Sequence, residues 1–377
     1  MNILILAKDY PPKVGGVENY SQNLAEGLRK YQNCQVLSFA IKDSPISKVD
    51  RLPVKRIQPI IESEFVKSIQ FSLMVLWILS TTKVDVIYAT TWKVAAPVFL
   101  LKRIFNFKLF ITVHGAEITR HKNNRLTMAI MRTVLKSARQ IISVSDFTKT
   151  KVLEYCKDLK PNSVKVVPNG IHFEDLKPKD KINSRKRLGL SQDSLVLLTI
   201  SRIDQRKGQG IVIEAIPKLI STYPQLRYII VGDGPYRQQL EKRVKQLKIE
   251  AHVFFTGFVD FKELDYYYSA CDMFVLLNTM ESDQDFEGFG LVFAEAAYYK
   301  KISIAGNNGG PMEVINNKVT GYLIEPNTTN LLKLFKEVDL SPEHLTKMGE
   351  AAYRRTAKKY DIQKMIHQTN SIITENR

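Results

Sequence analysis

The stretch Leu195-Val-Leu-Leu-Thr-Ile-Ser-Arg-Ile-Asp-Gln-Arg-Lys-Gly208 decides the fold of this 377-residue chain. It begins with an almost entirely apolar run, Leu195–Ile200, which is typical of a strand buried on both faces in a parallel sheet. A basic loop that ends in glycine follows, and then the helical pattern of Gly210–Tyr223. Strand, loop and helix in this order are the repeating unit of parallel α/β proteins.

The same unit recurs on both sides of this stretch. Before it, we predict strands over Asn2–Leu6, Gln35–Ala40, Val84–Tyr88, Lys108–Val113, Gln140–Val144 and Val164–Val167, and helices over Glu18–Lys30, Lys67–Ser80, Thr91–Ile104, Asn124–Ser137 and Asp146–Cys156. After it, we predict strands over Arg227–Val231, Val253–Thr256, Met273–Leu276 and Ser303–Ala305, and helices over Pro235–Leu247, Phe261–Ala270, Leu291–Tyr299 and Pro311–Val314.

Two such series, separated by the polar stretch Phe173–Gln192, predict an α/β protein with two Rossmann-like domains facing a cleft. We expect an N-terminal domain over residues 1–180 and a C-terminal domain over residues 181–360. The last predicted helix, Ile362–Thr374, lies in the segment 361–377 and could return to the N-terminal domain.

Composition limits the class of protein. Apolar residues make up 44% of the chain, as in a globular protein. The net charge is +17, and residues 1–180 hold 28 Lys and Arg against 15 Asp and Glu, so the positive field belongs to the first half. Three widely spaced cysteines and the absence of a signal-peptide pattern at the start suggest a cytoplasmic chain with reduced thiols. The uncharged stretch 68–82 is too short to span a bilayer and is expected to form a buried helix, with an interfacial patch as the alternative.

Several glycine-rich or charged loops follow predicted strands, where ligands bind in open α/β sheets. Gly15 and Gly16 allow a tight turn just before a helix. His114 follows a strand directly and precedes a glycine, a position from which it could face the cleft. Arg202 and Lys207 follow Leu195–Ile200 and could converge on a diphosphate, unless they belong to a solvated basic loop.

The segment Glu287-Gly-Phe-Gly-Leu-Val-Phe-Ala-Glu295 places two carboxylates eight positions apart. Eight residues are a little over two helical turns, so the two side chains could line one side of an element that starts at the glycines. Gly288 and Gly290 would let backbone N–H groups approach an anion, and the carboxylates would accept sugar hydroxyls. The alternative is an amphipathic helix with two solvated glutamates.

Two other glycine motifs are weaker. Val231-Gly-Asp-Gly-Pro235 departs from the dinucleotide-binding pattern and lacks its acidic follower, so we do not expect a nicotinamide site. Another predicted strand is followed by Gly257, Phe258 and Val259, whose backbone could border the base of a bound nucleotide.

In their order along the chain, these segments resemble the retaining glycosyltransferases of family 4, which have the GT-B fold. The resemblance rests on Gly15-Gly16, His114-Gly115, Pro168-Asn-Gly-Ile171, Ser201-Arg202 with Lys207-Gly208, Val231–Pro235, Gly257-Phe258, Glu287 with Glu295, and Gly309-Gly310 with Glu313. It covers nearly the whole chain. In Gly309-Gly-Pro-Met-Glu313 the proline does not directly precede the glutamate as it usually does in the family, which leaves the role of Glu313 open.

The resemblance implies a role for each of these positions. Arg202 and Lys207 would hold the donor diphosphate, Glu287 would contact hydroxyls of the donor sugar, and Glu295 would contact the ribose. Gly16 would lie over the diphosphate and His114 beside the transferred sugar. The backbone around Phe289, Gly290 and Leu291 would face the donor. The resemblance also implies retention of the anomeric configuration, by front-face attack in which the leaving phosphate assists deprotonation, without a dedicated nucleophile.

No metal and no cofactor are expected. Asp283-Gln-Asp285 has the form of a metal-binding DxD motif, but it lies in a polar loop and we interpret it as solvated. The donor is expected to be GDP-mannose or a UDP-hexose, with a slight preference for GDP-mannose, because the acidic insertion before Glu287 is similar to one in mannosyltransferases of the family.

The acceptor is expected to be lipid-linked or a saccharide. Residues 120–139 combine cations with apolar residues and could form a helix on an anionic membrane, or a helix whose apolar face lies in the core. A peripheral enzyme at the cytoplasmic face of a membrane is therefore our expectation. A sugar-nucleotide epimerase of the same fold is the rival enzyme. A basic nucleic-acid-binding protein is the rival non-enzyme, but the chain has no nucleic-acid-binding module, so nucleic acid is not expected as a partner.

Overall fold

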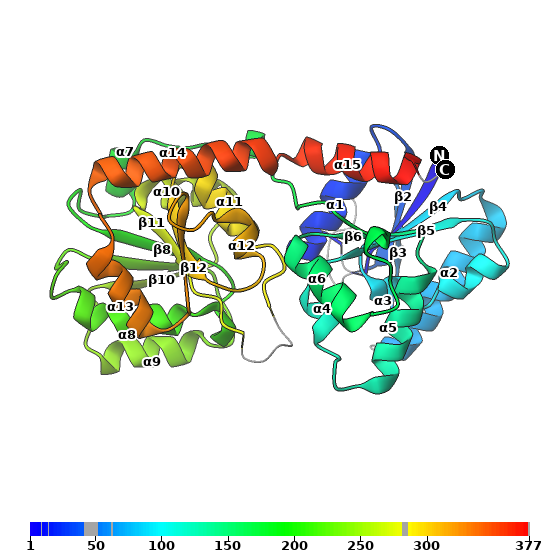
Figure 1. The fold of residues 1–377 in the computed structure, drawn as a ribbon, viewed down its shortest axis with the longest axis horizontal. Helices are drawn as coiled ribbons and strands as arrows, with labels where there is room; N and C mark the ends of the chain where they lie inside the picture. Colours follow the sequence, from blue (N-terminus) through cyan, green and yellow to red (C-terminus); the bar gives the residue numbers. More distant parts are fainter. Residues whose placement is uncertain (9, 14, 41–51, 62, 281–285, 376–377) are drawn as a thin grey trace. The chain divides into compact units, whose positions relative to one another are not determined.

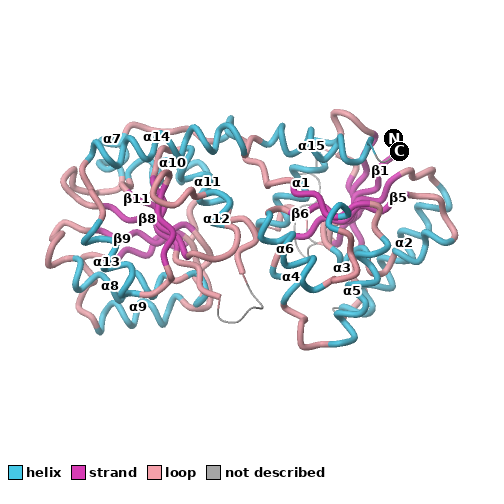
Figure 2. The backbone as a smooth tube through the Cα atoms, in the orientation of Figure 1, coloured by secondary structure: helices cyan, strands magenta, loops and turns pink. Residues whose placement is uncertain are grey.

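The structure is a computed structural model that describes residues 1–375 apart from residues 9, 14, 41–51, 62 and 281–285. The chain divides into two compact units. Unit 1 comprises Met1–Gly170 and Ile362–Arg377, and unit 2 comprises Ile171–Asp361. In each unit, helices lie on both faces of a parallel sheet (Figure 2). Both sheets are thus parallel α/β layers, as the alternating sequence pattern predicts.

Unit 1 holds a seven-stranded sheet in the order β3-β2-β1-β4-β5-β6-β7. Its strands are β1 (Asn2–Leu6), β2 (Asn33–Phe39), β3 (Val54–Ile57), β4 (Val86–Ala89), β5 (Lys108–Val113), β6 (Gln140–Ser143) and β7 (Val164–Val166). The strand order reverses between β1 and β4, so the loops after these two strands diverge, which opens a place for a ligand at the carboxyl edge. Strand β3, a short edge strand with two basic residues, was not predicted.

The helices of unit 1 bury apolar residues against both faces of this sheet. They are α1 (Gly16–Leu28), α2 (Glu64–Thr81), α3 (Trp92–Ala95), α4 (Ala116–Thr119), α5 (Arg125–Ser137), α6 (Asp146–Tyr155) and α15 (Ile362–Glu375), with the 3-10 turns η1 (Phe99–Arg103) and η2 (Pro161–Ser163). The prediction of one helix over Thr91–Ile104 is wrong. It is broken into α3 and η1 at Pro97, which has no N–H to continue the helical ladder.

Helix α15, from the far end of the chain, packs on α1. A Cβ added to Gly27 of α1 would lie 2.3 Å from Cγ1 of Ile366, so the two helices touch at a glycine. The amide of Gln32 donates a hydrogen bond of 2.8 Å to the side chain of Asn370. Residues 1–170 therefore complete their core with a helix contributed by residues 362–375.

Unit 2 holds a six-stranded parallel sheet in the order β10-β9-β8-β11-β12-β13. Its strands are β8 (Val196–Ile200), β9 (Arg227–Val231), β10 (Val253–Gly257), β11 (Met273–Leu276), β12 (Ile302–Gly306) and β13 (Gly321–Ile324). Its helices are η3 (Phe173–Asp175), α7 (Lys181–Arg187), η4 (Gln205–Lys207), α8 (Gln209–Leu219), α9 (Arg237–Gln246), α10 (Phe261–Ala270), α11 (Leu291–Tyr298), α12 (Pro311–Val314), α13 (Thr328–Glu337) and α14 (Pro342–Lys359) (Figure 1).

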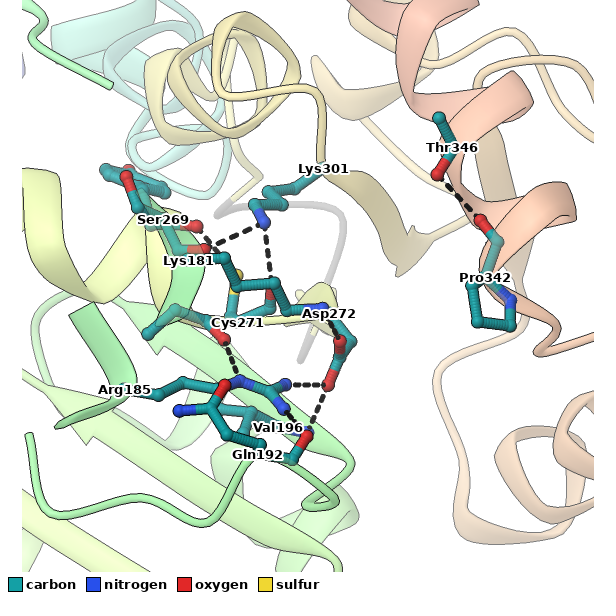
Figure 3. A network of polar contacts seen from close by, with 12 residues as sticks. Lys181, Arg185, Gln192, Val196, Ser269, Cys271, Asp272, Lys301, Pro342 and Thr346 are labelled. Atoms are coloured by element: carbon teal, nitrogen blue, oxygen red, sulfur yellow. Dashed lines mark hydrogen bonds and ion pairs between the residues drawn. The ribbon is translucent and has the colours of Figure 1, made fainter. Parts of the chain in front are cut away.

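The polar stretch Phe173–Gln192 contains helix α7, which is anchored to unit 2 by charges around Asp272 (Figure 3). Lys181 Nζ and Arg185 Nη2 donate to the two carboxylate oxygens of Asp272 at 2.6 and 2.7 Å. The backbone N–H of Val196, at the start of β8, donates to the same carboxylate at 2.7 Å. The Arg185 side chain is buried, so this part of the stretch is fixed to unit 2.

Helix α2 contradicts its predicted burial. Only Phe71, Val75 and Ile78 of its residues are buried, although the helix is rich in apolar residues. Its opposite side leaves large apolar side chains exposed. No described helix of the chain is long and apolar enough to cross a membrane.

Helix α5 buries its main apolar face in the core. Met128, Met131, Val134 and Leu135 are buried in the core of unit 1. The membrane-facing interpretation of residues 120–139 is therefore wrong for the main apolar face of this helix, which packs on the sheet instead.

Candidate active site

An ion pair joins the loops that follow two neighbouring strands of unit 2, β8 and β11. Lys207, at the end of η4, donates from Nζ to Oε2 of Glu287 at 2.5 Å. The two side chains are only 13% and 22% exposed. Nδ2 of Asn278 donates to the same oxygen at 3.2 Å, and Nη1 of Arg206 lies 3.7 Å from it. A carboxylate is thus surrounded by donors at the carboxyl edge of the sheet.

These contacts decide the charge of Glu287. Burial raises the pKa of its carboxyl, but the opposing charges of Lys207 and Arg206 and the hydrogen bond from Asn278 outweigh burial and hold the pKa below its usual value. Glu287 is therefore ionised at neutral pH. Among the described residues, the side-chain contacts of Glu287 all use Oε2, which leaves Oε1 as an acceptor for a ligand hydroxyl.

Glycines fix the loops that carry this pair. Gly208 has φ of +72°, and a Cβ there would lie 2.0 Å from the carbonyl oxygen of Leu277, at the end of β11. A Cβ on Gly310 would lie 2.3 Å from Cα of Phe289, and its N–H donates to the carbonyl oxygen of Glu287 at 2.6 Å. Only glycine fits at these two positions, so the turns before α8 and α11 are held against their neighbours.

The loop after β9 has a packing role. A Cβ on Gly232 would lie 2.1 Å from the carbonyl oxygen of Ser201, and a Cβ on Gly234 would lie 2.1 Å from that of Ile203. The glycines of Val231–Pro235 therefore let this loop support the loop that carries Arg202. The buried side chain of Gln209 adds hydrogen bonds to Oγ of Ser201 and the carbonyl oxygen of Arg202.

Arg202 lies in the same loop after β8 as Lys207. Its side chain is exposed and makes no hydrogen bond or ion pair with any residue that the structure describes. Among the described residues, Arg206, adjacent to Lys207 in η4, is the arginine that lies within 4 Å of the Glu287 carboxylate.

Glu295 lies apart from the Glu287 pair. Glu287 precedes the helix, and α11 begins at Leu291, after Gly290 with φ of +82°, so the eight-residue spacing is not a helical repeat. The expectation that both glutamates line one element is therefore wrong, and so is its alternative of a solvated amphipathic helix. Oε2 of Glu295 accepts a hydrogen bond of 2.7 Å from Tyr268 of α10, and burial raises the pKa of its carboxyl.

The other residues expected to contact the donor differ in burial. The Phe289 ring is buried and packs edge-on against Tyr360 with centroids 5.2 Å apart. Gly257 ends β10 with φ of +73°, and the Phe258 side chain that follows is 78% exposed. Val259 and Gly288 are half-buried.

In unit 1, His114 directly follows β5 and is half-buried. Its ring meets Tyr20 of α1 edge-on, with centroids 4.8 Å apart, and its Nε2 lies 2.8 Å from the carbonyl oxygen of Thr90. Because a carbonyl only accepts, Nε2 carries the hydrogen and Nδ1 is the acceptor nitrogen of the neutral ring. Burial lowers the pKa of His114, so the neutral form prevails at pH 7.

Gly15 and Gly16 stand at the start of α1, after the loop that follows β1. A Cβ on Gly15 would collide with the Glu18 carboxylate, whereas a Cβ on Gly16 would meet nothing within 4 Å. The space beside Gly16 is therefore open to a ligand.

Two family models match the chain in succession. The model described as Glycosyltransferase Family 4 matches residues 14–175, and the model described as Glycosyl transferases group 1 matches residues 180–355. The chain belongs to these glycosyltransferases.

Known glycosyltransferases match this chain over most of its length. The chain is 28% identical over 341 residues to an uncharacterized glycosyltransferase of Methanocaldococcus jannaschii, covering 86% of this chain and 85% of that protein. It is 24% identical to a GDP-mannose-dependent alpha-(1-6)-phosphatidylinositol monomannoside mannosyltransferase of Mycolicibacterium smegmatis, again covering 86% and 85%. The crystal structure of Anabaena HepE in complex with UDP superimposes with a TM-score of 0.84 at 22% identity, with both chains fully covered. That likeness confirms the GT-B fold.

Three polar residues that contact the two glutamates were not predicted. Arg206 and Asn278 contact Glu287, and Tyr268 contacts Glu295. Arg206 could have been suspected beside Lys207, but Asn278 and Tyr268 meet the glutamates only through the packing of β11 and α10. As for a metal, no three His, Cys, Asp or Glu side chains of the described residues gather to hold an ion, and Asp283 and Asp285 lie outside those residues.

Proposed function

We propose that this glycosyltransferase transfers a hexose of the mannose or glucose type, with retention, from a nucleotide-diphosphate sugar to a lipid-linked or saccharide acceptor. The observation that carries the proposal is the Lys207–Glu287 pair at the carboxyl edge of the unit 2 sheet. It places a cation and a hydroxyl acceptor side by side, as a sugar joined to a diphosphate requires.

Lys207 and Arg202 bind the diphosphate in this proposal. When the glycosidic bond breaks, negative charge grows on the departing diphosphate, and fixed cations stabilise it. Lys207 is held in place by Glu287, and the exposed guanidinium of Arg202 is available to form bidentate hydrogen bonds with a phosphate. A fixed donor of this kind contributes roughly 3–4 kcal/mol to the transition state.

Carboxylates orient the sugars of the donor. Oε1 of Glu287 accepts hydroxyl hydrogen bonds of the transferred hexose, while Oε2 keeps its contacts with Lys207 and Asn278. Glu295 accepts from the ribose, and the backbone at Gly288–Leu291 and at Gly257–Val259 borders the rest of the nucleotide.

Unit 1 contributes His114 and Gly16. The acceptor nitrogen Nδ1 of the neutral His114 takes a hydroxyl hydrogen bond from the transferred sugar. Gly16 leaves open space for the diphosphate.

For the donor, we propose GDP-mannose ahead of a UDP-hexose. Several relatives are named as GDP-mannose-dependent mannosyltransferases of phosphatidylinositol mannosides, at 24–27% identity. HepE, of similar fold, was crystallised with UDP and with UDP-glucose, so the test must cover both bases. The acceptors of those relatives support a lipid-linked acceptor for this chain. The three buried, unpaired cysteines support action in the cytoplasm.

A thermal-shift screen tests the donor. A ligand at 100 times its dissociation constant adds about 2.7 kcal/mol to stability, so GDP, UDP, ADP and their sugar conjugates are readily compared. We expect stabilisation by one nucleotide series, weakened in Lys207→Met. Lys218→Met, an exposed lysine of α8, is the matched control and should respond like the wild type. Stabilisation by no nucleotide would overturn the proposal.

Transfer itself is tested with the identified donor and a lipid-linked or saccharide acceptor. The anomeric configuration of the product, read by NMR, decides retention. We expect full activity after exhaustive chelation, because Lys207 and Arg202 supply the positive charge at the diphosphate. Loss of activity that Mn²⁺ or Mg²⁺ restores would overturn metal independence. Conversion of the donor without any acceptor would indicate an epimerase.

A further inference from the structure

Helix α2 carries an exposed apolar stripe that the core of unit 1 does not use. The stripe consists of Phe65, Ile69, Leu73, Leu76 and Trp77, with Phe65 74% and Leu73 60% exposed. Their spacing of three to four residues puts them on one side of the helix, while Phe71, Val75 and Ile78 bury the other side. In Figure 1, α2 lies at the periphery of unit 1. A helix that is apolar on both sides needs an apolar environment beyond its own core.

Neighbouring segments extend this surface. Ile60 and Ile61 precede α2 and are exposed, and Leu100 and Ile104 are exposed on and after η1. The hydroxyl of Ser72, in α2, donates to the carbonyl oxygen of Pro97 at 3.0 Å, which ties α2 to the segment that leads into η1. We call these residues, with the stripe, the α2 surface.

Positive charge flanks the α2 surface. Nζ of Lys55 lies 3.7 Å from the centroid of the Trp77 ring, and both residues line a groove of about 510 Å³ between β3 and α2. Residues 55–104 hold seven lysines and arginines against three carboxylates. Glu64, the one carboxylate within α2, is paired with Lys8 at 2.7 Å. The flank of the stripe is therefore suited to anions.

We propose that the α2 surface docks onto an anionic lipid bilayer. The apolar stripe enters the boundary between headgroups and acyl chains, Trp77 lies at the interface, and Lys55 and Lys83 meet lipid phosphates. The proposal rests on the proposed function in one respect: a lipid-linked acceptor would be presented at the surface to which the enzyme binds.

The combination of features favours a bilayer over a second protein. The stripe is long and narrow, ends in a tryptophan, and is flanked by lysines that can reach headgroups along their flexible side chains. Helix α5 lacks this character because its main apolar face is in the core, although Leu126 and Ile130 are exposed. These two residues provide a matched control.

The test is co-sedimentation of the full chain with vesicles of phosphatidylcholine alone or mixed with phosphatidylglycerol. We expect binding to the anionic vesicles, at least tenfold weaker in Leu73→Ser/Trp77→Ser. Leu126→Ser/Ile130→Ser should bind like the wild type. Lys55→Gln/Lys83→Gln should lose the preference for anionic lipid and its sensitivity to salt. The substituted apolar side chains and Lys83 are exposed and Lys55 is half-buried at the surface, so the folds of the variants should be unchanged, as checked by circular dichroism.

Trp77 gives a second readout. The chain has two tryptophans, and Trp92 is buried, so a blue shift of the emission on adding vesicles reports Trp77. Wild-type protein that stays in the supernatant, or a stripe variant that binds equally well, would overturn the proposal. A dimer in sedimentation velocity that depends on Leu73 and Trp77, without vesicle binding, would overturn it in favour of a second copy.

Nucleotide binding separates this proposal from the proposed function. The stripe variant should keep the thermal shift with its nucleotide, because the α2 surface lies outside the donor site. If the protein binds vesicles but no nucleotide changes its melting temperature, only the transferase proposal is overturned. If a nucleotide stabilises the protein but it does not bind vesicles, only the docking proposal is overturned.

Discussion

Replacing Lys207 by methionine removes the nearest cation from the Glu287 carboxylate while keeping most of the side-chain volume. Breaking a buried ion pair from one side costs about 3–5 kcal/mol, because the remaining charge stays buried. Here the side chains retain 13% and 22% exposure, and Arg206 stays 3.7 Å from Oε2. We therefore expect a loss of about 2–3 kcal/mol, with unit 2 melting about 4–12 °C lower.

A double-mutant cycle isolates the pair. Lys207→Met/Glu287→Gln removes both charges, so its stability should return to within about 1 kcal/mol of the wild type, which gives a coupling energy near 2 kcal/mol. The assay is urea unfolding at pH 7 followed by circular dichroism, with Lys218→Met as the control. If the stability losses of the two single variants sum to the loss of the double variant within about 0.5 kcal/mol, the reasoning is refuted, because the coupling energy between Lys207 and Glu287 would then be zero.

The pH dependence supplies an internal check. The pKa of Glu287 is held below its unfolded value, so the stability from this carboxylate is present above about pH 4.5 and is lost as the pH falls through the lowered folded value. The stability difference between wild type and Lys207→Met should shrink over that interval. A difference that stays constant down to pH 3 would contradict ionisation of Glu287 as the cause.

Further predictions concern single positions. Gly310→Ala should destabilise unit 2 by more than about 2 kcal/mol and abolish donor binding in the thermal-shift assay, because its Cβ would collide with Phe289, whereas Gly16→Ala should leave the melting temperature unchanged. Burial raises the pKa of Glu295, so the wild type should lose stability as the pH rises from about 4.5 through the raised folded value, and Glu295→Gln should not. Burial lowers the pKa of His114, so the wild type should lose stability as the pH falls from about 6.5 through the lowered folded value. A stability difference between the wild type and His114→Gln that does not change with pH, measured by melting, would refute this prediction.

The fold was predictable where apolar runs are long. Strands β1, β5, β9 and β11 have their predicted bounds, because each is buried and interrupted by no charge. Strand β3 was missed, since its two basic residues hide a short strand at the sheet edge. Helix α2 shows the opposite limit, because apolar composition indicates that a segment avoids water but does not say what covers it.

For the candidate site, the sequence predicted Lys207 and Glu287 but not the other residues that contact Glu287. Lys207 and Glu287 meet as loops at the carboxyl ends of neighbouring strands should. The contact of Asn278 with Glu287 depends on how three loops pack, which no spacing in the sequence reports. The loop with Gly232 and Gly234 resembles a phosphate-binding loop in sequence, yet the space beside both glycines is filled by backbone.

The place of α15 has a consequence for the order in which the protein is made. A ribosome completes residues 1–170 long before it reaches Ile362, and at about 5–20 residues per second the intervening chain takes on the order of ten to forty seconds. Throughout that interval the side of α1 around Gly27 has no helix against it. Unit 2 can therefore finish folding before unit 1, although unit 1 emerges first, and a nascent chain stalled before Ile362 would present uncovered apolar surface to chaperones and proteases.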